Sequence, residues 1–145
     1  MSQTLTNLLF HVVFSTKVRR RLITHNLKPR LLAYIGGIIR ELDGRLLVAD
    51  GTADHVHLLM RLPPKVPPAD ALRVIKANSS RWANQSDFRW QAGYAAFSVS
   101  ESNVAAVTRY IRNQEQHDRK ISFQDELRAF LKEHRIEYDE RYIWE

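Results

Sequence analysis

The chain has 145 residues, the usual size of one domain, so a single domain over 1–145 is expected. Hydrophobic residues make up 44% and charged residues 26%, a balance that excludes a disordered chain and allows one core. Lys and Arg outnumber Asp and Glu by 22 to 16, which favours a polyanionic partner such as nucleic acid. The lack of cysteine excludes disulfides and thiolate metal sites, so any metal must be held by His, carboxylate or amide groups.

The apolar segment near the N-terminus is interpreted as part of a strand. Leu8–Phe14 is too short to cross a membrane, and it lacks the basic segment and the small-residue cleavage site that flank the apolar core of a signal peptide. We therefore expect a cytoplasmic protein with no membrane partner.

The first half of the chain is predicted to contain a strand, a helix and a hairpin. Loosely alternating apolar residues over 5–15 predict a strand, which leads into a basic loop. Apolar residues at three- and four-residue intervals over 24–42 predict a helix. Apolar runs over 45–49 and 55–62, separated by turn residues, then predict a hairpin.

The second half is predicted to add two short strands and three helices. Prolines end the hairpin, and a helical period with a basic flank resumes over 70–84. Short strands are expected over 88–91 and 94–100, followed by helices over about 103–119 and 122–134 and by an aromatic tail that caps the core. This order predicts an α+β fold with a central antiparallel or mixed sheet, similar to ferredoxin or RRM domains, and helices packed on it.

Two histidines in the second hairpin strand are candidate metal ligands. Side chains alternate along a strand, so His55 and His57 project from one face while Val56 points into the core on the other. Two imidazoles at this spacing can chelate a metal. For an isolated His-x-His pair, however, two polar residues on an exposed sheet face are the more common case.

A second candidate cluster lies on the helix predicted over 103–119. Tyr110 and Gln114 are four residues apart on one helical face, and His117 extends the stripe by one turn. Taken singly, each is more often an ordinary core or surface residue. The neighbouring Arg109 and Arg112 form either a solvated basic face or a contact for a DNA backbone.

Together these motifs resemble the single-tyrosine HUH transposases of small bacterial insertion sequences, including the REP-associated tyrosine transposases. The segments that carry the resemblance are Asp54–Leu59, Asn78–Trp82, Phe97–Ser100 and Val107–Glu115. The first is similar to the HUH motif of two histidines around a hydrophobic residue, and the last is similar to the tyrosine helix. The match follows almost the whole chain in order. Where many relatives have paired histidines after the tyrosine helix, this chain has His117-Asp118.

The resemblance implies a transposase of the bacterial cytoplasm that cleaves single-stranded DNA beside hairpins at the ends of an element. Tyr110 would be the nucleophile, forming a 5′-phosphotyrosine link whose reversal allows strand transfer. His55, His57 and Gln114 would bind one Mg²⁺ or Mn²⁺ ion, with His117 in an accessory role. A homodimer is implied, in which the tyrosine helix can complete the partner's histidine site.

Exposed cations are expected to contact the DNA backbone. The candidates are Lys17, Arg19, Arg20, Arg21, Arg73, Lys76, Arg81, Arg109 and Arg112.

Three alternative functions stay open at the level of sequence. A non-catalytic nucleic-acid binder with an RRM-like sheet would tolerate Tyr110→Phe. A metal-dependent hydrolase would use water as the nucleophile and leave no covalent adduct. A domesticated relative of the transposases would cut chromosomal hairpins without mobilising itself.

Overall fold

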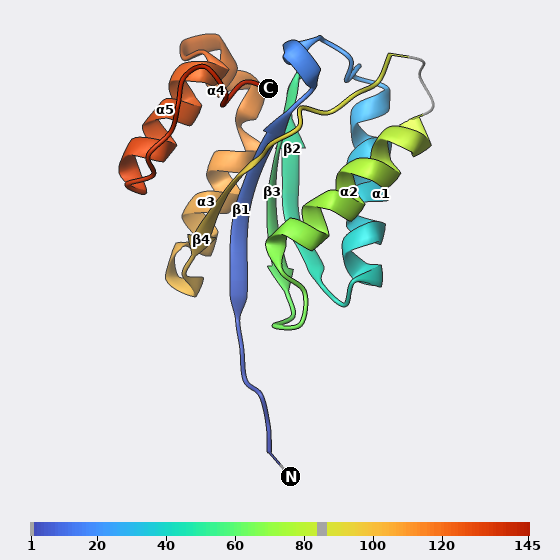
Figure 1. Cartoon of the computed structure of the whole chain (residues 1–145), viewed down its shortest axis with the longest axis vertical. Coiled ribbons are helices and arrows are strands. Elements are labelled where there is room, and N and C mark those ends of the chain that lie inside the picture. The colour runs from blue at the N-terminus through green and yellow to red at the C-terminus, as the bar shows by residue number, and fades with distance from the viewer. Residues whose placement is uncertain (1, 84–86) are drawn as a thin grey trace.

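A four-stranded sheet with helices on both faces forms the fold (Figure 1), which the computed structural model describes over residues 2–83 and 87–145. The elements are, in chain order, β1 (Leu8–Ser15), the 3-10 helix η1 (Lys17–Arg19), α1 (Leu27–Glu41), β2 (Arg45–Gly51), β3 (His55–Leu62), α2 (Pro68–Ala83), β4 (Ala95–Val99), the 3-10 helix η2 (Glu101–Asn103), α3 (Val104–Arg112), α4 (Gln114–Lys120) and α5 (Phe123–Glu133). The strand order is β2-β3-β1-β4, and every neighbouring pair is antiparallel. The predicted α+β class with an antiparallel sheet is confirmed.

The two faces of the sheet bury different cores. Helices α1 and α2 cover one face, and α3, α4 and α5 lie on the other (Figure 1). Along β1 and β3, Val12 and Val56 belong to the first core, whereas Val13 packs with residues of α5 and Leu59 packs with Ile111 of α3. Because helices cover both faces, nearly every side chain of β1 and β3 is buried.

Two predicted elements differ from the structure. The strand predicted over 88–91 is reduced to one isolated bridge between Trp90 and Thr16, because β1 ends there and the chain turns into η1. The helix predicted over 103–119 is two helices, α3 and α4, which meet at Asn113. Its φ of −104° and ψ of 25° end the first helix and place it at the N-cap of the second.

The other predicted elements are present with small shifts at their ends. The N-terminal strand begins at Leu8, and the last residue predicted for the second helix, residue 84, lies outside the described residues. The C-terminal tail packs Ile143 and Trp144 against the core between the sheet and α5, which agrees with a capping tail. None of the helices that the structure describes is long and apolar enough to span a membrane.

Candidate active site

The two histidines of β3 are buried on the sheet face that α3, α4 and α5 cover. His55 is 1% exposed and His57 is 0% exposed, while Val56 lies in the opposite core. An exposed polar pair is therefore excluded. The close approach of β2 to His55 requires Gly51, since an added Cβ there would lie 2.2 Å from the His55 carbonyl oxygen.

A polar partner fixes the Nδ1 atom of each histidine. His55 Nδ1 lies 2.8 Å from Asp54 Oδ1 and 3.0 Å from Thr52 Oγ1. His57 Nδ1 lies 2.9 Å from Nε2 of His11, a buried histidine of the neighbouring strand β1. Metal-binding imidazoles are held in this way, with the second ring nitrogen orienting the first.

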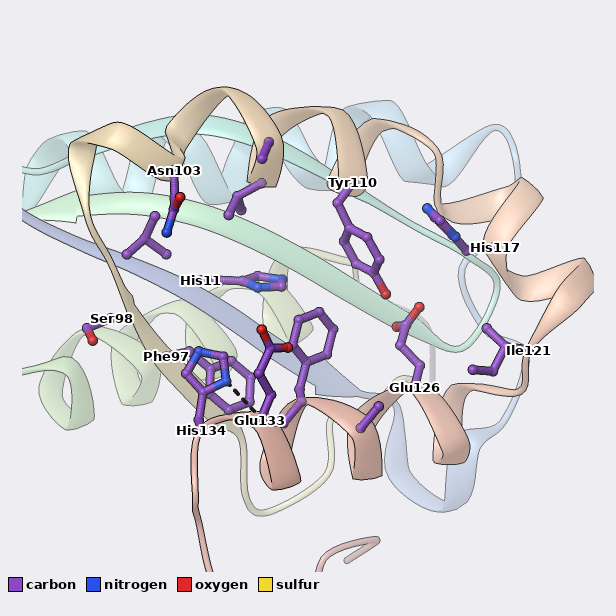
Figure 2. A pocket seen from close by; sticks show the side chains of 15 residues that line it. His11, Phe97, Ser98, Asn103, Tyr110, His117, Ile121, Glu126, Glu133 and His134 are labelled. Atoms are coloured by element: carbon purple, nitrogen blue, oxygen red, sulfur yellow. Dashed lines mark hydrogen bonds between the residues drawn. The ribbon is translucent and has the colours of Figure 1, made fainter.

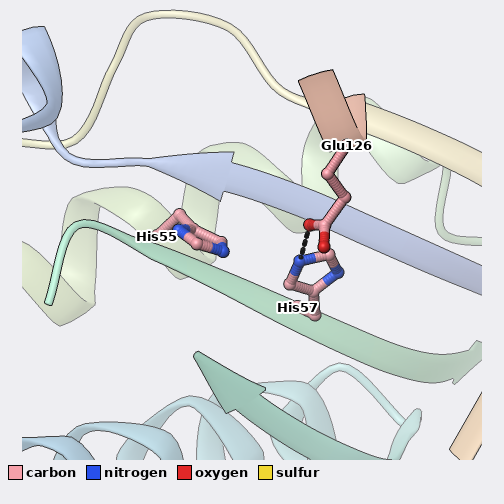
Figure 3. A group of neighbouring side chains, drawn as sticks. All are labelled: His55, His57 and Glu126. Atoms are coloured by element: carbon pink, nitrogen blue, oxygen red, sulfur yellow. Dashed lines mark hydrogen bonds and ion pairs between the residues drawn. The ribbon is translucent and has the colours of Figure 1, made fainter. Parts of the chain in front are cut away.

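Glu126 of α5 completes the cluster, and sequence analysis did not identify it. Its Oε1 lies 2.9 Å from His57 Nε2, and ligand atoms of His55, His57 and Glu126 all lie within 4.8 Å of one another (Figure 3). Gln114, a predicted ligand, is also buried, with Oε1 3.4 Å from His55 Nε2. Two imidazoles, a carboxylate and an amide thus converge on one buried position that could hold a metal ion.

Burial sets the charge states within this cluster. It lowers the pKa of His57, an effect that Glu126 only partly offsets, and with the nearby His57 it lowers the pKa of His11 to about 3. Burial raises the pKa of Glu126, but the hydrogen bond with His57 and the surrounding groups outweigh it, so the pKa lies below its ordinary value. At neutral pH a neutral His57 therefore donates through Nε2–H to an ionised Glu126. His57 Nδ1 then accepts from His11 Nε2–H.

Tyr110 reaches this cluster from α3. Its ring centroid is 5.9 Å from that of His57, and its hydroxyl points toward the Glu126 carboxylate (Figure 2). The His117 ring stacks on Tyr110 with centroids 4.6 Å apart. Burial, together with the Glu126 carboxylate, raises the pKa of Tyr110 above its ordinary value. The phenol consequently keeps its proton at neutral pH until a neighbouring group accepts it.

Contacts within the chain fasten the tyrosine helix over the chain's own histidines. Ile111 is fully buried against Leu59 beneath α3. Glu115 follows Ile111 by about one turn and lies in α4. Lys28 Nζ of α1 donates to Glu115 Oε1 at 3.3 Å and to Asp50 Oδ1 of β2 at 2.9 Å, which connects α1, β2 and α4. The break at Asn113 lets α4 turn toward this anchor while Gln114 still faces His55.

The basic residues predicted to bind DNA lie on several surfaces and do not enter the cluster. Lys17 and Arg19 lie in η1, Arg20 and Arg21 follow it, Arg73, Lys76 and Arg81 lie on α2, and Arg109 and Arg112 lie on α3. Most are exposed, and Arg19 and Lys76 are partly buried. Lys76 donates to the carbonyl oxygens of Ala92 and Gly93, and burial lowers its pKa to about 8.

Comparison with known proteins places this arrangement in a family. Residues 4–114 match the family described as "Transposase IS200 like". The chain is 29% identical over 133 residues to the transposase for insertion sequence element IS200 of Salmonella typhimurium, covering 82% of this chain and 84% of that protein. It is 23% identical over 123 residues to the ISDra2 transposase TnpA of Deinococcus radiodurans, covering 76% and 84%.

Solved structures share the fold. A Deinococcus radiodurans protein described as a transposase is similar with a TM-score of 0.62 and 22% identity, covering 79% of this chain and 95% of that one. A REP-associated tyrosine transposase bound to a REP hairpin is similar with a TM-score of 0.58 and 18% identity, covering 78% and 72%. The family match spans most of the sequence and includes the histidine pair, Tyr110 and Gln114. The chain therefore belongs to the IS200-like transposase family.

Proposed function

We propose that this protein is a metal-dependent endonuclease and strand transferase that cuts single-stranded DNA with Tyr110 as its nucleophile. The observation that carries the proposal is the convergence of a tyrosine hydroxyl on a buried cluster of His55, His57 and Glu126. A passive nucleic-acid binder does not require a tyrosine beside a set of buried metal-binding side chains, whereas metal-assisted attack on a phosphodiester uses both.

The donor set supports a divalent metal, Mg²⁺ or Mn²⁺. His55 and His57 would bind through Nε2, since Asp54 and His11 occupy the two Nδ1 atoms. In the metal-bound state the His57 proton would lie on Nδ1 and be donated to His11 Nε2. Glu126 would supply an anionic oxygen, and Gln114 would supply a neutral amide oxygen from the side of His55. The bound ion would neutralise charge on the scissile phosphate.

The cleavage step exchanges one phosphate ester for another. The Tyr110 oxygen bonds to phosphorus and the bond from phosphorus to the 3′-oxygen breaks, which leaves a 5′-phosphotyrosine and a free 3′-hydroxyl. The Glu126 carboxylate, toward which the hydroxyl points, accepts the phenolic proton, and this proton then passes through water to the departing 3′-oxygen, so Glu126 is ionised again after the step. Because the ester bond is conserved, a different 3′-hydroxyl can reverse the step and complete strand transfer.

The proposed DNA partner is a single strand that carries hairpins. The structurally similar REP-associated tyrosine transposase is bound to a REP hairpin, and the net charge of +6 suits a phosphate backbone. Two cleavages per transfer favour a homodimer. Since Tyr110 already lies beside the histidines of its own chain, each site of that dimer can be complete within one chain.

His11 is expected to support metal binding although it is not a ligand. His11→Phe keeps an aromatic ring at this position, but Nδ1 of His57 loses its hydrogen-bond partner, so we expect Mn²⁺ affinity to fall about 10–100-fold. Isothermal titration calorimetry with Mn²⁺ measures this change, with thermal unfolding as a check on folding. His25→Gln is the control, because the side chain of His25 is 92% exposed. Equal Mn²⁺ affinity in His11→Phe and the wild type would contradict this role.

The function is tested by incubating the purified protein with 3′-labelled single strands from the DNA that flanks its gene. The expected result is a labelled protein band on a denaturing gel that requires Mg²⁺ or Mn²⁺, and a DNA-modified peptide containing Tyr110 in mass spectrometry. Cleaved DNA without an adduct would indicate a hydrolase. Metal-independent binding without cleavage would indicate a passive nucleic-acid binder.

A further inference from the structure

A cavity of about 600 Å³ opens beside Tyr110, between β4, α3 and α5 (Figure 2). This volume lies within the range of about 300–1,000 Å³ that ligand pockets occupy. Tyr110 and Glu126 form part of its wall, so the cavity is continuous with the candidate active site. The proposed cleavage chemistry uses only this one end, which leaves most of the cavity without an assigned ligand.

Aromatic rings line part of the cavity. The rings of Phe97 and Phe130 stack with centroids 5.5 Å apart, and His134 stacks on Phe97 at 4.4 Å. Phe130 also meets the ring of Tyr110 edge-on at 5.4 Å. A flat ligand can stack against such rings, as bases do on the aromatic side chains of single-strand-binding proteins.

Away from the metal cluster, the residues that line the cavity do not favour a phosphate group. The chain has 22 Lys and Arg residues, yet none of them is among the described residues that line this cavity. Two carboxylates, Glu126 and Glu133, do line it. A phosphate here would face negative charge with no lining lysine or arginine to offset it, whereas an uncharged base would not.

We propose that this cavity receives one unpaired nucleobase, from a nucleotide adjacent to the phosphate that Tyr110 attacks. The inference rests on the proposed function, because it assigns the DNA strand cut by Tyr110 as the ligand. Stacking on the aromatic rings supplies affinity, and burial of the base fixes the register of the strand against the tyrosine hydroxyl.

Polar groups at the rim indicate which bases fit. Ser98, Asn103 and Glu133 are exposed residues that line the cavity. A carboxylate accepts from the exocyclic amino group of cytosine, and an asparagine amide can pair with the edge of adenine. The cavity therefore selects a base that carries an amino group and disfavours thymine, which has none.

The test measures binding without cleavage, in protein carrying Tyr110→Phe. The probe is a hairpin-bearing single strand from the DNA that flanks the gene, with each base beside the hairpin removed in turn to leave an abasic site. We expect one position at which base removal weakens binding about ten-fold. Ala106→Leu fills the cavity from an exposed position on α3. It should weaken binding of the intact strand by a similar factor, and removal of the base at the sensitive position should then cause no further loss of affinity.

Two matched variants serve as controls. Ala105→Leu adds the same side chain at the next exposed residue of α3, which does not line the cavity, and should leave the abasic pattern unchanged. The second control is Glu137→Gln, a change at an exposed residue that does not line the cavity. Glu133→Gln should reduce the discrimination against thymine at the sensitive position, and Glu137→Gln should leave it unchanged.

The proposal is wrong if the strand does not bind, if no position is sensitive, or if Ala106→Leu and Ala105→Leu give the same pattern. Covalent adducts formed by the wild-type protein are measured separately, so these results can refute base binding in the cavity without refuting cleavage by Tyr110.

Discussion

Replacing Tyr110 with phenylalanine is expected to abolish the covalent protein–DNA product while leaving the fold and DNA binding intact. Phenylalanine keeps the ring that stacks on His117 and meets Phe130, but it removes the oxygen atom that forms the ester in the proposed mechanism. Adduct formation should fall below about one-thousandth of the wild-type level. Denaturing electrophoresis of 3′-labelled strands measures the adduct, and thermal unfolding and gel-shift binding test the fold and the affinity.

Tyr142→Phe is the matched control for this experiment. Tyr142 is 57% exposed in the C-terminal tail, so losing its hydroxyl should not change the adduct yield. An adduct that persists in Tyr110→Phe would place the nucleophile elsewhere and refute the proposed mechanism. Unchanged cleavage without any adduct in either protein would make the enzyme a hydrolase.

Local sequence pattern predicted the parts of the site that lie within one element. The two-residue period of a strand placed His55 and His57 on one face and Val56 on the other, and burial confirms this arrangement. The helical period placed Tyr110 and Gln114 together. Both do approach the histidines, although they belong to two helices instead of one.

The break between those helices had only a weak signal in the sequence. Asn113 is a favoured N-cap residue, and Glu115 follows in the first turn of α4, yet neither glycine nor proline marks the position. The turn is fixed by tertiary contacts, since Glu115 pairs with Lys28 of α1. Contacts of this kind are not visible in a local pattern.

His11 and Glu126 were missed because they come from other elements. They are 46 and 69 residues away from His57, and only the sheet order and the packing of α5 bring them to it. Each residue nevertheless has a signal in the sequence. His11 interrupts an apolar strand, and Glu126 lies between Phe123 and Leu127 on the buried face of an amphipathic helix. A polar residue at a position that the pattern assigns to the core is a signal for a functional group.

Glu126→Gln is expected to weaken Mn²⁺ binding by about 100-fold or more. Glutamine has the same shape and can still accept a hydrogen bond from His57, so the fold is retained while the cluster loses its negative charge. Adduct formation at a fixed Mn²⁺ concentration should fall with it. Calorimetry with Mn²⁺ measures the affinity, and titration of the adduct yield with Mn²⁺ shows how far a higher metal concentration restores activity.

Two further variants show whether the loss of Mn²⁺ affinity is specific to Glu126. Glu133→Gln removes a carboxylate from the exposed end of the same helix and should leave Mn²⁺ affinity unchanged. Gln114→Ala removes a neutral amide and should have a smaller effect than Glu126→Gln, about ten-fold. The opposite order, with normal Mn²⁺ binding in Glu126→Gln and none in Gln114→Ala, would remove Glu126 from the ligand set and leave Gln114 as the third ligand beside the two histidines. Glu126 lies beyond the segment that matches the family, 4–114, so this comparison also decides whether α5 contributes to the metal site of this chain.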